Sequence, residues 1–536
     1  MDKEFCLLNE PWIKVLDQEN TIKEVSLLDV FRDAHKYKSL AGETVTQDAS
    51  ILRLLLAIVI TVLYRYDVDG QEDNVLEYED PEEVILERWS EYWKKGAFKA
   101  DTFQKYLETY KERFFLFHPE TPFWQVADLK DGTNYGIINL YGNIKESNNV
   151  ASRHHFHMTD GHYVETVSYA ETARWLVYNN AYSINVKTKV DGKNKPTGVG
   201  RLGKLGLIIV EENTIYKTIL MNLCALNGQG MAWNEPKPIW EQPPKIEVGV
   251  EIVPPDNLPE LYTIQSRRSL LQRKDGWVSG YRSVGGDYYS IINDLVEPMT
   301  LLKQDSKDKE NIKPLKHQKS IAAWREFPSM LVQSESLPLK PGLIRWLEEL
   351  MEDVQMKNKQ LITFHMIGLE YGDGMSYTNG ELIDESLSMS KELIKEKGDI
   401  WRRLITDEIE KCEEVVQKSY YFFAKELAAD LYKGDKKKTT DIVDSLATAY
   451  YYKIDRFFRE WLISIKPGES KKEEKEYEWQ QTSSKIAESV VVDYISGIDP
   501  QHIMICAKAV GIFKKNLYKI YPGMEKKGGD ENEQEK

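Results

Sequence analysis

The sequence predicts an α+β protein, in which a large, loop-rich domain of mixed structure over residues 1–392 precedes a four-helix bundle over residues 393–521. Two observations support this prediction. Between about residues 123 and 390, glycine and proline separate short β-type runs, whereas the chain after Gly398 has only helical patterns. The 536 residues, 41% hydrophobic and 11% aromatic, are enough for several domains with buried cores. The charged tail at 522–536 is expected to be disordered.

The first 120 residues are expected to form one strand followed by helices. The strand is the run at 7–15, which contains a proline. Helical patterns follow at 25–31, 46–66, 81–95 and 101–117. Thr46 and the two polar residues after it offer a cap, and Pro81 with two glutamates suits a first helical turn. The most apolar run, 51–63, contains Arg53 and is shorter than the ~20 residues that span a bilayer, so it predicts a buried helix.

The middle of the chain is expected to combine strands with two helices. Apolar runs bounded by turn-forming residues predict strands at 136–140, 207–210, 246–253 and 288–292. Helical patterns interrupt them at 168–179 and 342–354. No internal repeat is present in the sequence, so this region is predicted to be a mixed fold and not a repeat array.

Four helices with short connections are predicted after Gly398. They cover 399–432, 440–465, 472–495 and 499–520. Apolar residues recur every three or four positions, for example Val416 and Tyr420 in the first helix, Ile454 and Phe457 in the second, and those from Ile503 onward in the fourth. Such stripes are typical of a four-helix bundle, in which they form the core.

The charge and the cysteines restrict the class of protein. The formal net charge is −15 and the isoelectric point is about 5.3, so a protein that coats nucleic acid through its bulk charge is excluded. Any nucleic-acid contact must be a local patch, or must be made beside basic partners. The four cysteines lie far apart, which excludes a zinc ribbon and indicates reduced thiols in the cytoplasm. The first residues show no secretory signal.

Four of the nine histidines lie within nine residues: His154, His155, His157 and His162. Imidazoles and nearby carboxylates could bind a metal, but the spacing is neither that of a zincin helix nor that of a zinc finger. Polar residues around the cluster predict an exposed recognition loop without metal. Such a loop could contact RNA, since histidine stacks on bases and Arg153 can meet phosphate. A metal-dependent hydrolase or nuclease built on this cluster is the alternative.

A second candidate is a glycine-rich, basic segment. It contains Gly198, Gly200, Arg201, Gly203 and Lys204. The three glycines form a superficial GxGxxG, but they follow a basic loop and precede a β-like run, which is not the context of a dinucleotide site. No Gly-Lys-Ser/Thr follows, so a P-loop is excluded. The segment is either a surface turn or an exposed backbone that can approach a nucleic-acid groove or phosphate closely.

Two further segments could contact nucleic acid. The first, residues 267–282, interleaves basic and aromatic residues and includes Lys274 and Arg282, which suits backbone contact with stacking as well as a solvated face. The second, residues 368–377, predicts a tight hairpin. Its tip contains Asp373, Gly374, Met375 and Ser376. The acid argues against simple phosphate binding, but the tip could insert at a groove.

No catalytic motif has supporting context in the sequence. There is no GxSxG, no HExxH and no ordered Ser, His and Asp set, and the paired carboxylates lie on ordinary helix surfaces. The sequence therefore predicts no enzymatic activity and no cofactor or metal.

Taken in order along the chain, several segments resemble one known family, the large subunit (CasA) of Cascade, the type I-E CRISPR surveillance complex. They are residues 8–15, 118–125 and 168–176, the glycine segment, the hairpin at 368–377 and the terminal bundle. The resemblance implies a non-catalytic DNA-recognition subunit. Members of this family recognise the protospacer-adjacent motif of the target duplex from the minor groove, aid local unwinding and recruit the helicase–nuclease.

The resemblance also implies roles for particular residues. Gly198, Gly200 and Gly203, with Arg201 and Lys204, match the family's glycine loop. Asp373, Gly374, Met375 and Ser376 match its wedge, although the expected amide side chains are missing. Arg282, or Lys274, matches its basic finger. The loop that meets the guide RNA and a neighbouring subunit would contain Asn148, Asn149, Arg153, His154, His155 and Phe156.

The partners implied are the other Cascade subunits, the guide RNA, target double-stranded DNA and, transiently, the helicase–nuclease; no membrane is implied. An acidic chain that binds duplex poorly alone can do so when basic partners hold it in place. Minor-groove recognition separates A·T from G·C but is otherwise degenerate, so the motif is expected to be permissive. A scaffold that binds only protein is the remaining alternative.

Overall fold

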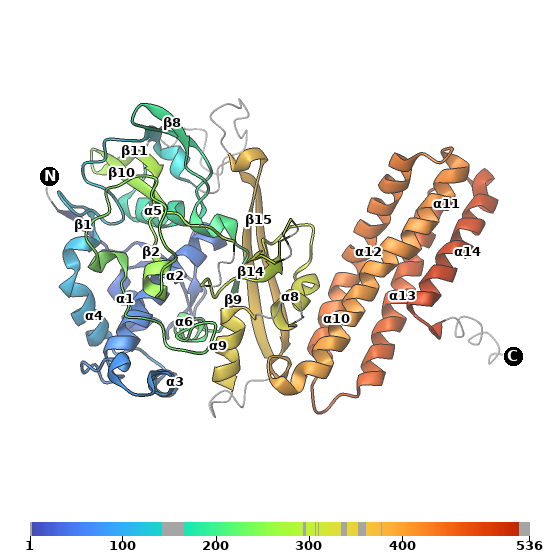
Figure 1. The fold of residues 1–536 in the computed structure, drawn as a ribbon, viewed down its shortest axis with the longest axis horizontal. Coiled ribbons are helices and arrows are strands. Elements are labelled where there is room, and N and C mark those ends of the chain that lie inside the picture. Colours follow the sequence, from blue (N-terminus) through green and yellow to red (C-terminus); the bar gives the residue numbers. More distant parts are fainter. Residues whose placement is uncertain are drawn as a thin grey trace. The chain divides into compact units, whose positions relative to one another are not determined.

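The computed structural model describes residues 3–141, 166–292, 296–305, 307–308, 310–333, 340–351, 361–376 and 378–524 (Figure 1). They form two compact units. The first contains the described residues up to Ile321, the helix that follows Pro341, and Thr363–Ser386. The second contains Ala322–Val332, residues 361–362, and the described chain from Leu387 onward. The α+β class is confirmed. The second unit includes Ala322–Val332, which the sequence assigns to the first domain.

The first part of the chain is built around one buried helix. In order, its elements are β1 (Glu4–Cys6), β2 (Ile13–Asp17), β3 (Ile22–Val25), α1 (Leu27–Asp33), β4 (Tyr37–Leu40), α2 (Val45–Arg65), α3 (Pro81–Lys95), α4 (Ala100–Thr109) and β5 (Phe115–Phe117). α2 is apolar and long enough to cross a membrane by length and composition, and 89% of that window is buried inside the protein. The predicted buried helix is confirmed, and Arg53 within it pairs with buried Glu297.

Three local predictions in this part need correction. The cap of α2 is Thr44, whose hydroxyl accepts from the Gln47 amide, and not Thr46. The predicted strand at 7–15 is interrupted before β2, and the predicted helix at 101–117 ends at Thr109. Phe115–Phe117 forms strand β5, whose backbone pairs antiparallel with β1. Aromatic residues favour such strands over continuation of the helix.

The middle of the chain contains several small antiparallel sheets. The elements are β6 (Thr133–Gly136), α5 (Tyr169–Tyr182), β7 (Lys187–Val190), β8 (Lys193–Pro196), β9 (Leu207–Glu211), α6 (Ile215–Met221), α7 (Leu258–Tyr262), β10 (Arg267–Lys274), β11 (Trp277–Gly285), β12 (Leu302–Gln304), β13 (Ile312–Pro314), α8 (Phe327–Leu331), α9 (Gly342–Met351), β14 (Leu361–Tyr371) and β15 (Thr378–Ser390). The sheet orders are β10-β11-β6, β15-β14-β9 and β3-β2-β4, with pairs β1-β5, β7-β8 and β12-β13. The long β14–β15 hairpin is clear in Figure 1.

The strand at 207–210 is confirmed as β9, but three predicted strands are wrong. Ile137–Leu140 is a turn of 3-10 helix. The runs at 246–253 and 288–292 make only an isolated bridge between Glu251 and Tyr288. The first of these two cannot bury its apolar side chains, since Ile246 and Val253 are 68% and 85% exposed.

The second unit contains the predicted helices. They are α10 (Asp399–Glu414), α11 (Tyr421–Leu431), α12 (Lys436–Ser464), α13 (Lys472–Ser496) and α14 (Ile503–Ile520), which lie side by side in Figure 1. A π-helical segment, Val415–Tyr420, joins α10 to α11. This wider turn places Val415 in the core in place of Val416. Of the tail expected to be disordered, 525–536 lies outside the described residues.

Candidate nucleic-acid interface

Asn185 joins two of the segments that the sequence singled out. α5 begins at Ser168, whose hydroxyl caps the Glu171 amide, and ends at Tyr182, so that Asn185 follows a buried, rigid helix. The Asn185 side-chain oxygen accepts from the Gly198 amide at 2.9 Å. Its side-chain nitrogen donates to the Gly374 carbonyl at 3.1 Å, and its backbone amide donates to the Met375 carbonyl at 2.8 Å. The glycine loop and the β14–β15 hairpin tip therefore form one surface.

The hairpin tip is short and open. Gly374 and Met375 both have positive φ, 62° and 56°, and the Met375 amide closes the turn onto the Gly372 carbonyl. A Cβ placed on Gly374 would have no neighbour within 4 Å among the described residues. Met375 is 48% exposed, and Ser376 is half-buried. The backbone of Asp373 lies at the start of the same turn. The tip thus offers a narrow edge that could enter a groove.

Only one of the three glycines in the predicted loop has an open backbone. Gly198 has φ +69° and open space around its Cα, and Arg267 holds its carbonyl at 2.6 Å. A Cβ on Gly200 would lie 2.5 Å from the Ala181 carbonyl oxygen, and a Cβ on Gly203 would overlap the Tyr371 hydroxyl. The expectation that all three glycines admit a groove is therefore corrected. Gly200 and Gly203 allow close packing inside the protein.

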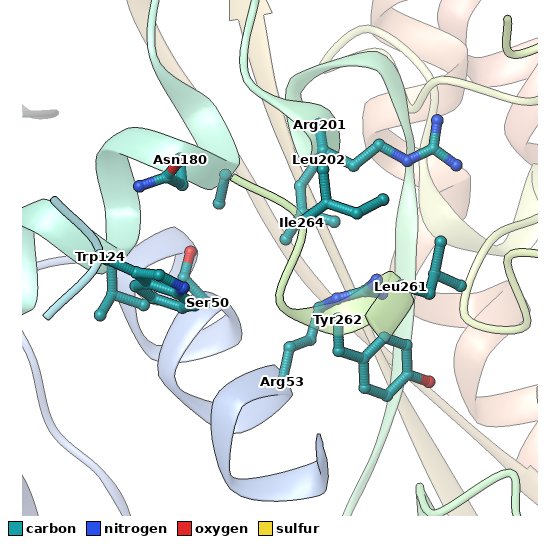
Figure 2. A pocket seen from close by; sticks show the side chains of 11 residues that line it. Ser50, Arg53, Trp124, Asn180, Arg201, Leu202, Leu261, Tyr262 and Ile264 are labelled. Carbon is teal, nitrogen blue, oxygen red and sulfur yellow. The ribbon is translucent and has the colours of Figure 1, made fainter. Parts of the chain in front are cut away.

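Arg201 and Lys204 are less accessible than the sequence suggests. Arg201 is buried, and its guanidinium stacks on Tyr289 with 4.1 Å to the ring centroid. Figure 2 shows it among the side chains of an interior pocket of about 30 Å³, which also includes Arg53 and Tyr262. Arg201 is therefore corrected from a DNA contact to an internal residue. Burial, together with the charges of Arg201 and Arg267, lowers the pKa of half-buried Lys204.

The two candidates for the basic finger lie away from this surface. Arg282 donates to Asn134 Oδ1 at 3.0 Å and to the Leu129 carbonyl at 2.9 Å, so it ties β11 to the segment beside it. Lys274 is exposed at the turn of the β10–β11 hairpin. The other end of that hairpin, where Arg267 pairs with Gly285, is seven residues or roughly 23 Å away. Neither residue joins the cluster around Gly198.

Sequence reasoning missed the cation that does lie near the tip. The Lys316 ammonium lies 4.5 Å from the centroid of the Tyr371 ring, and burial lowers its pKa. Tyr371 ends β14 and donates its hydroxyl to the Tyr182 carbonyl at 2.8 Å. Neither Lys316 nor Asn185 belongs to a motif, so no signal in the sequence singles them out.

Positive charge gathers on the β7–β8 hairpin despite the acidic chain. Its four lysines are exposed: Lys187, Lys189, Lys193 and Lys195. Within the described part of the chain, none of them forms an ion pair. The hairpin leads directly into Gly198, so a local cationic patch adjoins the open glycine.

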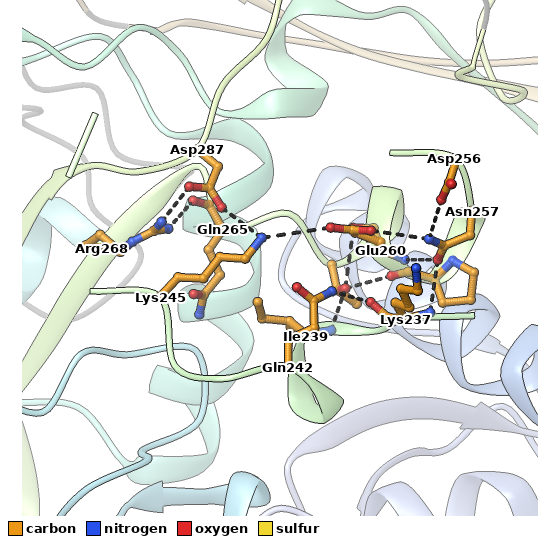
Figure 3. Close-up of polar contacts among 12 residues, drawn as sticks. Lys237, Ile239, Gln242, Lys245, Asp256, Asn257, Glu260, Gln265, Arg268 and Asp287 are labelled. Carbon is orange, nitrogen blue, oxygen red and sulfur yellow. Dashed lines mark hydrogen bonds and ion pairs between the residues drawn. The ribbon is translucent and has the colours of Figure 1, made fainter. Parts of the chain in front are cut away.

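A network of charges fixes the segment beside the glycine loop. Arg268 and Asp287 form a buried ion pair at 2.5 Å, and Lys245 lies 3.4 Å from Asp287 and 3.9 Å from Glu260 (Figure 3). Asn257 caps the short helix α7 by accepting from the Glu260 amide. Arg268 also donates to the Glu247 carbonyl, and the Gly249 amide donates to the Gly285 carbonyl. The ends of β10 and β11 are therefore hydrogen-bonded to the loop that contains Gly249.

The predicted guide-RNA loop falls in a part of the chain that the structure does not describe. Asn148, Asn149, Arg153, His154, His155 and Phe156 all lie in 142–165, outside the described residues. The alternative metal site at His154 to His162 lies there too. Among the residues that the structure does describe, no group of three His, Cys, Asp or Glu side chains could hold a metal ion.

Comparison with known proteins gives consistent matches. The model of the CRISPR-associated protein Cse1 family matches residues 7–490. The CRISPR-associated protein CasA/Cse1 of Thermus thermophilus is 27% identical over 339 residues, which are 61% of this chain and only 60% of that relative. The crystal structure of Thermobifida fusca Cse1 superposes with a TM-score of 0.80 at 25% identity, over 97% of this chain and 98% of the other.

A chain of a solved CRISPR RNA-guided surveillance complex has the same fold. Its TM-score is 0.72 at 16% identity, over 96% of this chain and 100% of the other. The resemblance noted in the sequence is thus confirmed at the level of the family. Because the family model matches residues 7–490, the chain belongs to the CRISPR-associated protein Cse1 family.

Proposed function

We propose that this chain is the large, non-catalytic subunit of a cytoplasmic CRISPR RNA-guided surveillance complex. Family membership and the shared fold with a chain of such a complex support the proposal. Other subunits and the guide RNA would then be its constant partners. Target DNA and a helicase–nuclease would bind to the assembled complex.

Within the complex, the surface made by Gly198, Asn185 and the tip at Gly374–Ser376 recognises the protospacer-adjacent motif from the minor groove. The observation that carries this proposal is the pair of hydrogen bonds through which Asn185 holds an open glycine beside an open hairpin tip. A backbone without side chains can approach the floor of a minor groove, where only A·T and G·C are distinguished. The recognised motif is therefore permissive, and pairing with the guide supplies the remaining specificity.

The tip also aids local unwinding. Met375 is an exposed apolar side chain on a strained turn, and apolar side chains inserted between base steps unstack them at a cost of a few kcal/mol. Pyrimidine–purine steps unstack most easily, so the tip acts best at such a step. Lys316 and the lysines of the β7–β8 hairpin supply phosphate contacts that the acidic chain otherwise lacks.

Reconstitution with and without this chain tests the function. The complete complex should bind a duplex with a cognate flanking motif more tightly than one with a scrambled flank, in a gel-shift titration at fixed salt. The complex without this chain should bind both equally. Unchanged discrimination without the chain would reject motif recognition and leave the scaffold role.

A further inference from the structure

A pocket of about 480 Å³ lies beside the glycine loop. Its walls come from the β7–β8 hairpin, the glycine loop, the segment Val248–Gly249, the start of β10, and the end of β11 with the residues after it. The volume falls in the range of small-molecule sites, about 300–1,000 Å³. It is large enough for one base with its sugar and phosphate.

The pocket has an excess of positive charge. Lys195 and Lys204 line it, and within the described part of the chain neither side-chain ammonium forms a hydrogen bond or an ion pair. Arg267 also lines the wall, and its guanidinium donates to the neutral carbonyls of Gly198, Ile184 and Ser266. The acid in the wall, Asp287, is already paired with Arg268 and Lys245 (Figure 3). The ammonium charges of Lys195 and Lys204 are therefore not neutralised, and they favour binding of an anion.

The rest of the pocket suits a flat apolar group. Val190, Val248 and Val284 line it, and Tyr288, which is 46% exposed, offers an aromatic ring. Gly249 and Gly285 add wall without side chains. An aromatic ring with apolar neighbours stacks on a nucleobase of any sequence, while cations hold the phosphate.

We propose that this pocket binds one nucleoside monophosphate unit, with the phosphate at Lys195 and Lys204 and the base against Tyr288. The unit is either a free nucleotide or one nucleotide of a single strand, which present the same chemistry. The pocket shares Gly198 and Lys204 with the glycine loop and Lys195 with the β7–β8 hairpin. Binding of a monophosphate by the isolated protein nevertheless needs no duplex recognition by the assembled complex.

Isothermal titration of the full-length protein tests the pocket with thymidine monophosphate, thymidine and an octathymidylate. We expect saturable binding of the monophosphate and weaker binding of thymidine. Lys195→Gln, Lys204→Gln and Tyr288→Ala should each weaken the monophosphate about tenfold. Lys130→Gln is the matched control, because Lys130 is exposed on the segment that contacts the same hairpin through Asp131 but lies outside the pocket wall, and it should leave binding unchanged.

The two sources of the ligand are separated by the same titrations. If the natural ligand is part of a single strand, octathymidylate should bind more tightly than the monophosphate, and the same variants should weaken its binding. Equal affinity of the two ligands indicates the free nucleotide. The proposal is overturned when neither the monophosphate nor octathymidylate binds saturably, or when Lys195→Gln and Tyr288→Ala bind like Lys130→Gln. Thermal unfolding of each variant establishes that it is folded. Duplex recognition by the assembled complex is measured separately, so the two results stay distinct.

Discussion

Asn185 accepts a hydrogen bond from the backbone amide of Gly198 at 2.9 Å, although the two residues belong to separate segments on either side of the β7–β8 hairpin. The same side chain reaches the Gly374 carbonyl, far along the chain. The half-buried amide of Asn185 thus determines how the loop and the hairpin tip are spaced. The proposed duplex-binding surface depends on this spacing.

Asn185→Ala should weaken binding of motif-bearing duplex to the assembled complex. Two side-chain hydrogen bonds are lost, at about 1 kcal/mol each, which corresponds to roughly ten- to thirtyfold in affinity if both orient the surface. Asn234→Ala, which removes an exposed amide bond to Asp256, is the matched control and should bind as the wild type does. Equal duplex affinity of the two variants in a gel-shift titration would exclude the bridging role.

Gly200→Ala should destabilise the fold, whereas Gly198→Ala should cost less. The added Cβ at Gly200 meets the backbone of Ala181, which cannot move as a flexible side chain can, so overpacking of about 1–3 kcal/mol is expected. At Gly198 the space is open, and the cost is the left-handed backbone alone, about 1 kcal/mol. Urea denaturation of the isolated chain measures the free energy of unfolding of both variants. A Gly200→Ala protein as stable as the wild type would show that this glycine is not tightly packed.

His365 should make stability depend on pH. Burial lowers its pKa, but the ion pairs of the imidazole with Glu211 at 2.9 Å and with Asp384 at 2.5 Å outweigh burial, and the net pKa is raised. A raised histidine pKa stabilises the fold below the unfolded value of about 6.5, and this contribution is lost as pH rises through the folded pKa. His365→Gln should therefore lower the free energy of unfolding more at pH 6 than at pH 9. An equal loss of stability at both pH values would contradict stabilisation by a protonated His365 paired with two carboxylates.

Removing only one charge of the buried ion pair between Arg53 and Glu297 should lower the free energy of unfolding strongly. Its two hydrogen bonds, 2.7 and 2.9 Å long, lie where neither side chain meets solvent appreciably. Glu297→Gln leaves a buried guanidinium without its countercharge, and a loss of about 3–5 kcal/mol is expected. The double variant Arg53→Met with Glu297→Met should recover much of that stability. Chemical denaturation of the wild type, Glu297→Gln and the double variant checks this, and a double variant less stable than Glu297→Gln would argue against coupling.

Much of the fold follows from local patterns in the sequence. Helices such as α3 could be predicted because Pro81 and the glutamates after it define the start, while Gly96 with φ +73° defines the end. The apolar stripes of the bundle were equally informative, but the π-helical turn at Val415–Tyr420 buries Val415 in place of Val416. Separately, in α12, Phe457 is 46% exposed while Phe458 is buried. A pattern with a uniform helical period cannot anticipate such a turn.

The candidate site was harder to predict, because its parts meet only through tertiary contacts. The sequence located Gly198 and the tip at Gly374–Ser376, since glycine is needed where φ is positive. It could not separate open Gly198 from packed Gly200, because that difference depends on how α5 lies against the loop. For the same reason Arg201 and Arg282 looked like free cations, yet Arg201 is buried against Tyr289 and half-buried Arg282 is hydrogen-bonded to the Leu129 carbonyl.

The most direct test compares Gly198→Asp with Gly276→Asp in the reconstituted complex. Both glycines have positive φ and open space, and both variants add one carboxylate, but Gly276 lies at the far turn of the β10–β11 hairpin. The account predicts that Gly198→Asp abolishes the preference for a duplex with the cognate motif while complex assembly persists, and that Gly276→Asp leaves the preference intact. Full discrimination by the Gly198→Asp complex would contradict it.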